Sequence, residues 1–167
     1  MTKLPDGRQI LIRRIRPDDK DRLSRGLRAL SDRSVQRRFL SPKRSFSKAE
    51  LRYLTEVDGR NHVALVAESP TEPTRRLIGV ARFIRWHDDP KAAEAAIVVA
   101  DDWQGRGVGT ALARQLAARA RGLGIKRFTA TMAADNRPAH RLLETLSTEL
   151  ERRHVGGADE LVTHLAA

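Results

Sequence analysis

The chain has 167 residues and a formal net charge of +11, and its 40% hydrophobic and 32% charged residues describe one soluble globular domain over residues 1–167. The absence of cysteine excludes a disulfide framework, a thiol nucleophile and thiolate metal sites. No apolar run approaches the roughly 18–20 residues of a membrane span and the N-terminus lacks a signal-peptide core, so a cytoplasmic protein without membrane contact is expected.

The first third of the chain predicts one strand followed by helices. Residues Arg8–Ile15 alternate apolar and polar side chains, as a half-buried strand does. Three helices follow, each with its own first-turn or capping signal: Pro17 with Asp18 and Asp19, Ser31 or Asp32, and Ser47 with Glu50 in a capping box. Most of the sheet must therefore come from later residues.

The middle of the chain predicts strands. His62–Ser69, Arg76–Trp86 and Glu94–Ala100 are rich in β-formers and joined by short links, which favours an antiparallel meander. A helix from about Gly105 to Arg121 comes next, and the strand Ile125–Met132 follows it. Such a strand–helix–strand crossover makes its two strands parallel.

A last helix and a hairpin complete the prediction. Asn136 is placed at the cap of this helix and Pro138 in its first turn. The tail can fold back on itself around the sequence GGAD, which makes a closing hairpin. The order of elements predicts an α/β chain of the α+β type, with a mixed, mostly antiparallel central sheet flanked by helices.

The positive charge has two interpretations. It can attract an anionic partner, such as nucleic acid, a nucleotide cofactor or an acidic protein, or it can reflect arginines spread over solvated faces. Aromatic residues make up only 4% of the chain, and no recognition motif accompanies the basic residues. Specific nucleic-acid binding is therefore not expected.

The glycine-dense turn between the predicted strand Glu94–Ala100 and the next helix predicts an anion site. Gly105, Gly107 and Gly109 allow positive φ and close approach of the backbone to a ligand. Backbone N–H groups at a helix N-terminus lack intrahelical partners, and together with the helix dipole they favour phosphate. Glycines that serve turn geometry alone are the alternative, but three alternating glycines exceed what a turn needs.

Two common phosphate motifs fit this turn poorly. A Walker loop needs a lysine after the glycines, and none is present. A dinucleotide fingerprint would place glycine where Thr110 stands, although Asp135 after the next strand could mimic its ribose-binding acid. That fold would also begin with this unit, whereas here a meander precedes it and a hairpin follows. Another kind of phosphate ligand is therefore expected.

The stretch from Gln104 to Gly109 resembles the Q/R-x-x-G-x-G/A signature of the GNAT superfamily of acyl-coenzyme A-dependent N-acetyltransferases, and the order of elements over nearly the whole chain is similar to theirs. The resemblance implies the GNAT fold, whose sheet is splayed at the signature strand, and acetyl-CoA as co-substrate. It also implies that the residues that bind the diphosphate are Gln104, Gly105, Arg106, Gly107, Val108, Gly109 and Thr110.

The resemblance also implies how the rest of the cofactor lies. The backbone of Ile97, Val98 and Val99 is expected to pair with the pantetheine arm as an added strand would. Asn136 matches an asparagine that contacts the pantetheine region, while capping of the last helix is an equally good explanation of this residue. Trp103 is expected to pack beside the cofactor.

The stretch AEAAIVVADDWQGRGVG is especially similar to bacterial protein-lysine acetyltransferases of the Pat type, in which the glutamate matching Glu94 is the general base. An ammonium with a pKa near ~10 must lose a proton before it attacks, so a nearby carboxylate is useful. Partial burial would make Glu94 a better base; an exposed charge at a strand end is the alternative. A backbone N–H around Val99 would stabilise the oxyanion.

The chain departs from the family pattern in its last helix. The position that often carries a tyrosine, the general acid for the leaving thiolate, is Leu143, and Tyr53 lies in an early helix. Solvent could supply the proton instead. No histidine pairs with carboxylates at metal-ligand spacing, so no metal is predicted.

The sequence thus predicts direct transfer of acetyl from acetyl-CoA to a primary amine, with protein lysine as one candidate acceptor and Glu94 as base. The alternative is a catalytically weak CoA-binding module with a regulatory or interaction role. The early helices would form one wall of the acceptor cleft, and the basic composition disfavours polyamine acceptors. The chain is expected to be a monomer or a homodimer.

Overall fold

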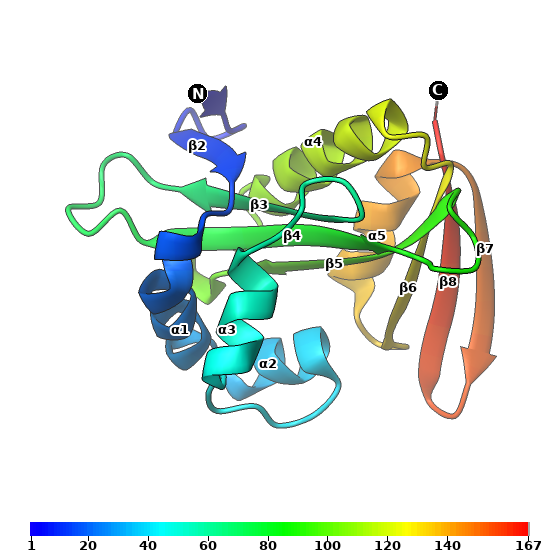
Figure 1. Cartoon of the computed structure of the whole chain (residues 1–167), viewed down its shortest axis with the longest axis horizontal. Coiled ribbons are helices and arrows are strands. Elements are labelled where there is room, and N and C mark those ends of the chain that lie inside the picture. The colour runs from blue at the N-terminus through cyan, green and yellow to red at the C-terminus, as the bar shows by residue number, and fades with distance from the viewer. Residues whose placement is uncertain (167) are drawn as a thin grey trace.

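The computed structural model describes residues 1–166, and at residue 148 only the backbone. Its strands form one 8-stranded sheet in the order β1-β2-β3-β4-β5-β6-β8-β7 (Figure 1). The strands are β1 (Thr2–Lys3), β2 (Gln9–Arg14), β3 (His62–Glu68), β4 (Leu77–Arg85), β5 (Ala92–Val99), β6 (Arg127–Ala133), β7 (Ser147–Val155) and β8 (Ala158–Leu165). Every described pair is antiparallel except β5 with β6, which confirms the predicted mixed sheet.

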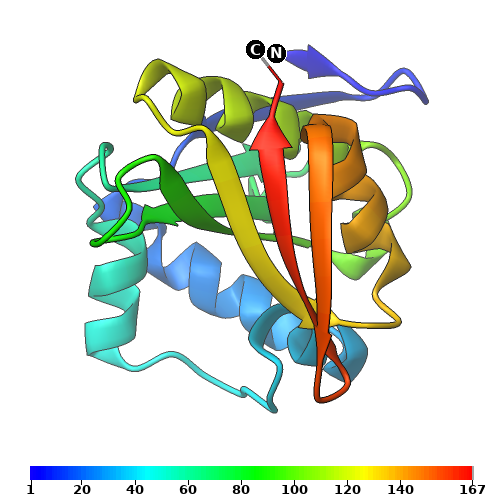
Figure 2. The same ribbon diagram turned by 90° about the vertical axis from the view of Figure 1, so that its right-hand side faces the viewer.

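Helices cover both faces of the sheet. The two perpendicular views show one group of helices on each face (Figures 1 and 2). The first group is α1 (Lys20–Ala29), α2 (Asp32–Phe39) and α3 (Lys48–Thr55), and the second is α4 (Val108–Gly122) and α5 (Arg137–Leu146). None of the helices in residues 1–166 is long and apolar enough to cross a membrane.

The predicted helix starts are largely confirmed. Ser31 Oγ accepts a hydrogen bond from Ser34 N at 3.2 Å and so caps α2. Ser47 and Glu50 form the predicted capping box, with hydrogen bonds of 3.1 and 2.7 Å. The turn that begins at Pro17 is a 3-10 turn, which leads into α1.

The signature helix begins later than predicted, at Val108 rather than Gly105. Gly105 and Gly107 have φ of +71° and +94°, which an α-helix cannot contain. The prediction for β5 was also short, because the strand begins at Ala92, two residues before Glu94. β1 was missed because a strand of 2 residues is too short to show alternation.

The sheet splays between β5 and β6, as the resemblance implied. Their parallel pairing covers three residue pairs only: Ala92 with Arg127, Ala93 with Phe128, and Glu94 with Thr129. Beyond Glu94 the two strands separate, while β5 stays paired with β4 as far as Val99. One edge of β5 is therefore open over its second half.

Each face of the sheet has its own hydrophobic core. On one face Leu112 and Leu116 of α4 pack against Ile78, Phe83 and Phe128, and all five side chains are buried. On the other face a second cluster lies beneath α1 and α3, and it includes the partly buried Val98 of β5. Because side chains alternate along a strand, Glu94 and Ala96 lie on the same face as Val98.

An ion network that the sequence did not indicate ties the early helices to the sheet. Arg13 of β2 donates to both carboxylate oxygens of Asp19 at 2.8 Å, and its Nε donates to Glu68 at 2.8 Å. Arg22 of α1 donates to the same Glu68 at 2.8 Å. Burial would raise the pKa of Asp19, but hydrogen bonds from Arg13 and Arg16 outweigh it and hold this pKa below its usual range.

Candidate active site

The turn between β5 and α4 presents a run of unpartnered backbone donors. Within the described chain, the N–H groups of residues 105–110 have no hydrogen-bond acceptor, and the first bond of the helix runs from Ala111 N to Gly107 O at 3.0 Å. Positive φ at Gly105 and Gly107 curves this segment, which we call the amide cradle. Curved runs of N–H groups at a helix N-terminus bind anions.

The three glycines of the turn have different roles. A Cβ on Gly107 would lie 2.9 Å from Pro5 Cδ, and one on Gly109 would lie 3.2 Å from Leu142 Cδ1. These two glycines therefore allow close packing against the N-terminal segment and α5. A Cβ on Gly105 would meet nothing within 4 Å, so this glycine alone borders open space.

In the residues predicted to bind the diphosphate, the side chains offer a ligand fewer hydrogen-bonding groups than the backbone does. Val108 is buried in the core, so only its N–H is available. The guanidinium of Arg106 is directed at the N-terminal segment: Nε donates to Asp102 O at 3.1 Å and Nη1 lies 3.6 Å from Asp6 Oδ2. Thr110 lines the cavity described below, where its hydroxyl can reach a ligand.

Gln104 holds the turn in place. Its Nε2 donates to Ser34 Oγ at 3.1 Å, to Val99 O at 3.0 Å and to Asp101 Oδ1 at 3.2 Å. Asp101 also accepts from Ser31 N at 2.7 Å, so it links the turn to α2. The side chain of Gln104 is thus a positioning group for the amide cradle.

The open edge of β5 is formed by Ala95, Ile97 and Val99. Ala100 N donates to Ile78 O at 2.9 Å, and alternation along an antiparallel strand then directs the even-numbered backbone groups of β5 toward β4. The N–H and C=O groups of the odd-numbered residues face the gap between β5 and β6. They are available to a ligand that adds to the sheet, apart from Val99 O, which Gln104 occupies.

Val98 is a correction to the prediction. It pairs with Val80 of β4, so its backbone groups are directed away from the gap and cannot pair with a pantetheine arm. The alternation that exposes Ile97 and Val99 excludes Val98 between them. Val98 still lines the cavity next to this edge.

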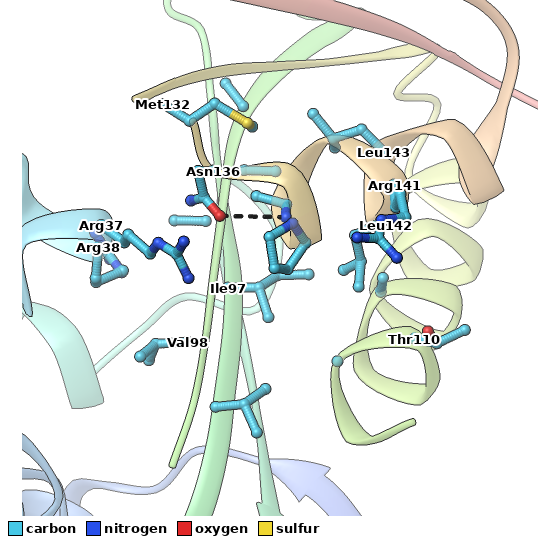
Figure 3. A pocket seen from close by; sticks show the side chains of 18 of the residues that line it. Arg37, Arg38, Ile97, Val98, Thr110, Met132, Asn136, Arg141, Leu142 and Leu143 are labelled. Atoms are coloured by element: carbon cyan, nitrogen blue, oxygen red, sulfur yellow. Dashed lines mark hydrogen bonds between the residues drawn. The ribbon is translucent and has the colours of Figure 1, made fainter. Parts of the chain in front are cut away.

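A cavity of about 550 Å³ joins the amide cradle to the open edge. It lies between β5, β6, α2, α4 and α5, and Figure 3 shows its lining side chains. Among the described residues that line it, the ionisable side chains are all arginines: Arg37, Arg38 and Arg141. The sequence reasoning missed all three, because arginines are frequent throughout the chain and nothing local distinguishes these. Trp103, which is buried, also lines the cavity as expected.

Asn136 can serve both roles proposed for it. Its Oδ1 accepts from Ala139 N at 3.4 Å, which caps α5 (Figure 3). The residue is only 7% exposed and lines the cavity, and its side-chain NH2 group has no hydrogen-bond partner in the described chain. Capping therefore leaves the amide donor available to a ligand.

Leu143 places an apolar group where the family often has tyrosine. Its side chain is buried with Met132 and Leu161, and it lines the cavity. Neither tyrosine, histidine nor a carboxylic acid is among the described residues that line the cavity. A side-chain general acid in the usual place is therefore absent from the described part of the site.

Glu94 lies at the last residue pair before β5 and β6 separate. Its side chain is exposed, so it lacks the partial burial that would have made it a better base. It forms no hydrogen bond or ion pair with a described residue, but it is close enough to Arg38 to act on that charge. No cluster of three metal-ligating side chains occurs in residues 1–166.

Arg82 and His62 lie on the same face of the sheet as Glu94, beneath α3. Arg82 is 5% exposed, and its Nη1 donates to Leu54 O at 3.1 Å and to His62 Nε2 at 3.0 Å. His62 must be unprotonated at Nε2 to accept this bond. Burial, followed by the charge of Arg82, lowers the pKa of His62 to about 4.

We predict that His62 makes the fold sensitive to acid. Between pH 6.5 and about 4 the unfolded chain binds a proton at His62 that the folded protein does not, so the free energy of unfolding falls as the pH is lowered through this window. A loss of about 1–2 kcal/mol is expected for this partly exposed group. Urea titrations at pH 7 and pH 4.5 should show a smaller loss in His62→Gln than in the wild type. The exposed control His87→Gln should behave as wild type, and equal losses in both variants would contradict the prediction.

Comparison with known proteins gives the family. Residues 31–147 match the model of the Acetyltransferase (GNAT) family. Acetyltransferase Pat of Mycolicibacterium smegmatis is 33% identical over 151 residues, which are 90% of this chain and 44% of that protein, so the chain spans less than half the length of this relative.

Solved structures agree in fold. The GNAT domain of S. lividans PAT is 29% identical, with a TM-score of 0.87 over 98% of this chain and 95% of that one. The yncA protein of Salmonella typhimurium, solved with its cofactor acetyl-CoA, has a TM-score of 0.71 over 93% of this chain and 92% of that one; at 18% identity it shows the fold alone. On these grounds the chain belongs to the GNAT acetyltransferase family.

Proposed function

We propose that this chain is an acetyl-CoA-dependent N-acetyltransferase that passes the acetyl group directly to a primary amine. One observation carries the proposal: the amide cradle presents unpartnered N–H groups at the start of α4, beside the open edge of β5. These donors and the positive end of the helix dipole favour a diphosphate. Family membership supports acetyl-CoA, and so does its presence in a protein of the same fold.

The open edge supplies partners for the pantetheine arm. Backbone groups of Ala95 and Ile97 can bond its amides as a neighbouring strand would. Asn136 offers its side-chain NH2 from the other side of the cavity. An N–H of the open edge, with Ile97 and Val99 as candidates, would stabilise the oxyanion that develops on the thioester carbonyl.

Glu94 is proposed as the group that takes the proton of the attacking amine, directly or through water. Glu94 lies at the point where β5 and β6 separate, and because its side chain is exposed, an acceptor can reach its carboxylate. The new N–C bond forms as the C–S bond breaks, and the amine proton passes to Glu94. Because Leu143 cannot donate a proton, solvent protonates the thiolate, which is a tolerable leaving group.

Similarity to known proteins and the net charge are the two indications of which amines the protein accepts. The similarity to Pat-type proteins makes protein lysine one candidate acceptor. The net charge of +11 disfavours polyamines, because a basic surface repels polycations. Acidic protein surfaces that display a lysine remain compatible with this charge.

A second candidate is a CoA-binding module with little catalysis. Leu143 at the usual position of the acid and the exposure of Glu94 favour it. Mass spectrometry of an amine and peptide panel incubated with acetyl-CoA and the protein separates the two candidates. The enzyme proposal predicts acetylated product at a rate proportional to protein concentration; tight binding of acetyl-CoA without any product supports the module.

A further inference from the structure

Arg82 is a buried cation without a carboxylate partner in residues 1–166. Its hydrogen bonds reach a carbonyl oxygen and a neutral histidine, and its remaining N–H groups have no partner in the described chain. Arg13, by contrast, is enclosed by the carboxylates of Asp19 and Glu68. A buried guanidinium normally requires such a counter-charge, and none of the described carboxylates lies within ion-pair distance of Arg82.

Arg38 of α2 adds a second cation: it lines the cavity together with Ala96, the residue that pairs with Arg82 across the sheet. Arg38 is partly buried and forms no ion pair with a described carboxylate; its guanidinium lies 4.9 Å from the Phe39 ring centre. Burial, and then the charge of Arg38, lowers the pKa of Arg82 to about 10. The two arginines therefore repel one another; Glu94 offsets part of this charge at Arg38, and a second anion would stabilise both guanidinium groups.

Position separates Arg82 from the diphosphate site. Arg82 reaches α3 on the face of the sheet opposite α4, whereas the amide cradle lies at the start of α4. Arg82 pairs with Ala96 across the sheet, and Glu94 is two residues further along β5 on the same face. Such diagonal neighbours lie about 7–8 Å apart. A small amine held by Glu94 could therefore place a nearby carboxylate at Arg82.

We propose that Arg38 and Arg82 bind a carboxylate of the acceptor, so that the chain selects amines that carry a carboxylate a few bonds from the nitrogen. The inference rests on the proposed acetyltransferase function and names its substrate class. Free amino acids and lysines beside an acidic residue share this chemistry. A carboxylate can pair with a guanidinium through two parallel hydrogen bonds, which suits it to this pair of arginines.

Initial rates with matched acceptors test the inference. The free amino acids are compared with their carboxamides, and lysine peptides with a neighbouring aspartate are compared with peptides carrying asparagine there. The wild type should show a kcat/KM at least about tenfold higher for the carboxylate member of one of these pairs. The pair that shows the preference identifies the source of the carboxylate.

Variants assign the preference to the two arginines. Arg38→Gln and Arg82→Lys should bring the carboxylate-to-amide ratio close to one, mainly through KM, while calorimetry finds the acetyl-CoA affinity of Arg82→Lys unchanged. Arg33→Gln, which removes an exposed charge from the same helix, should keep the ratio. Because Arg38 does not hold α3, its variant remains informative if Arg82→Lys folds poorly.

Other outcomes overturn the inference. Equal rates of product formation for both members of every pair would overturn the carboxylate inference and leave the proposed activity standing. Variants that slow both members equally would do the same. A preference for succinyl-CoA over acetyl-CoA that disappears in the arginine variants would place the carboxylate on the acyl group and also overturn it. Absence of product with every acceptor would overturn this inference and the proposed activity together.

Discussion

Replacing Glu94 by glutamine is expected to lower kcat for amine acetylation by about 10²–10⁴-fold near neutral pH, the usual contribution of general base catalysis. The amide side chain keeps the shape of the glutamate but cannot take a proton. Glu94 lies where β5 and β6 separate and not in the amide cradle, so the Kd for acetyl-CoA should not change. Steady-state kinetics across pH and calorimetry measure the two quantities separately.

A matched control distinguishes this role from a general effect of charge. Asp88→Asn removes an exposed carboxylate from the loop before β5 and should leave kcat as in the wild type. If Glu94→Gln keeps both kcat and the pH–rate profile, Glu94 has no part in the mechanism. The exposed carboxylate of Glu94 would then be only a surface charge near the end of a strand, without a role in catalysis.

The second large effect is expected at Gly105. Valine there should weaken acetyl-CoA binding by about 100-fold or more, which corresponds to roughly 2.7 kcal/mol and to the loss of one or two charge-assisted hydrogen bonds. A β-branched residue is strained at φ +71°, and its side chain would enter the open space beside the cradle. Calorimetric titration with acetyl-CoA measures the change.

Gly156→Val is the control for backbone strain. Gly156 has φ +56° and open surroundings, but it lies in the turn between β7 and β8. This variant should lose stability and keep its affinity for acetyl-CoA. Gly107→Val is less informative, since its side chain would collide with Pro5 and destabilise the turn directly. Retained affinity in Gly105→Val would contradict the cradle.

Features of the fold that depend on local sequence were predictable. The capping box at Ser47 and Glu50 is confirmed, because these contacts span one turn of helix. The antiparallel meander was predictable from the short links between its strands. The parallel pairing of β5 and β6 was predictable from the helix that connects them. The splay could be expected only through the resemblance carried by the residues from Gln104 to Gly109.

Contacts between distant parts of the chain could not be read from local patterns. Nothing near Gly107 indicates that Pro5 fills the space beside it, and nothing near Arg82 indicates the carbonyl of Leu54. The exposure of Glu94 depends on how α2 and α3 sit over the sheet. The register between β5 and β4 decides which residues of β5 direct their backbone groups toward the gap, and it directs those of Val98 toward β4.

Amide NMR during titration with acetyl-CoA tests most directly whether the main chain of this turn holds the diphosphate. On isotope-labelled protein, the largest shifts are predicted at the N–H groups of residues 105–110 and at Ala95, Ile97 and Val99, while pantetheine alone should move only the open-edge group. Saturation with acetyl-CoA that leaves the resonances of residues 105–110 in place would contradict the account.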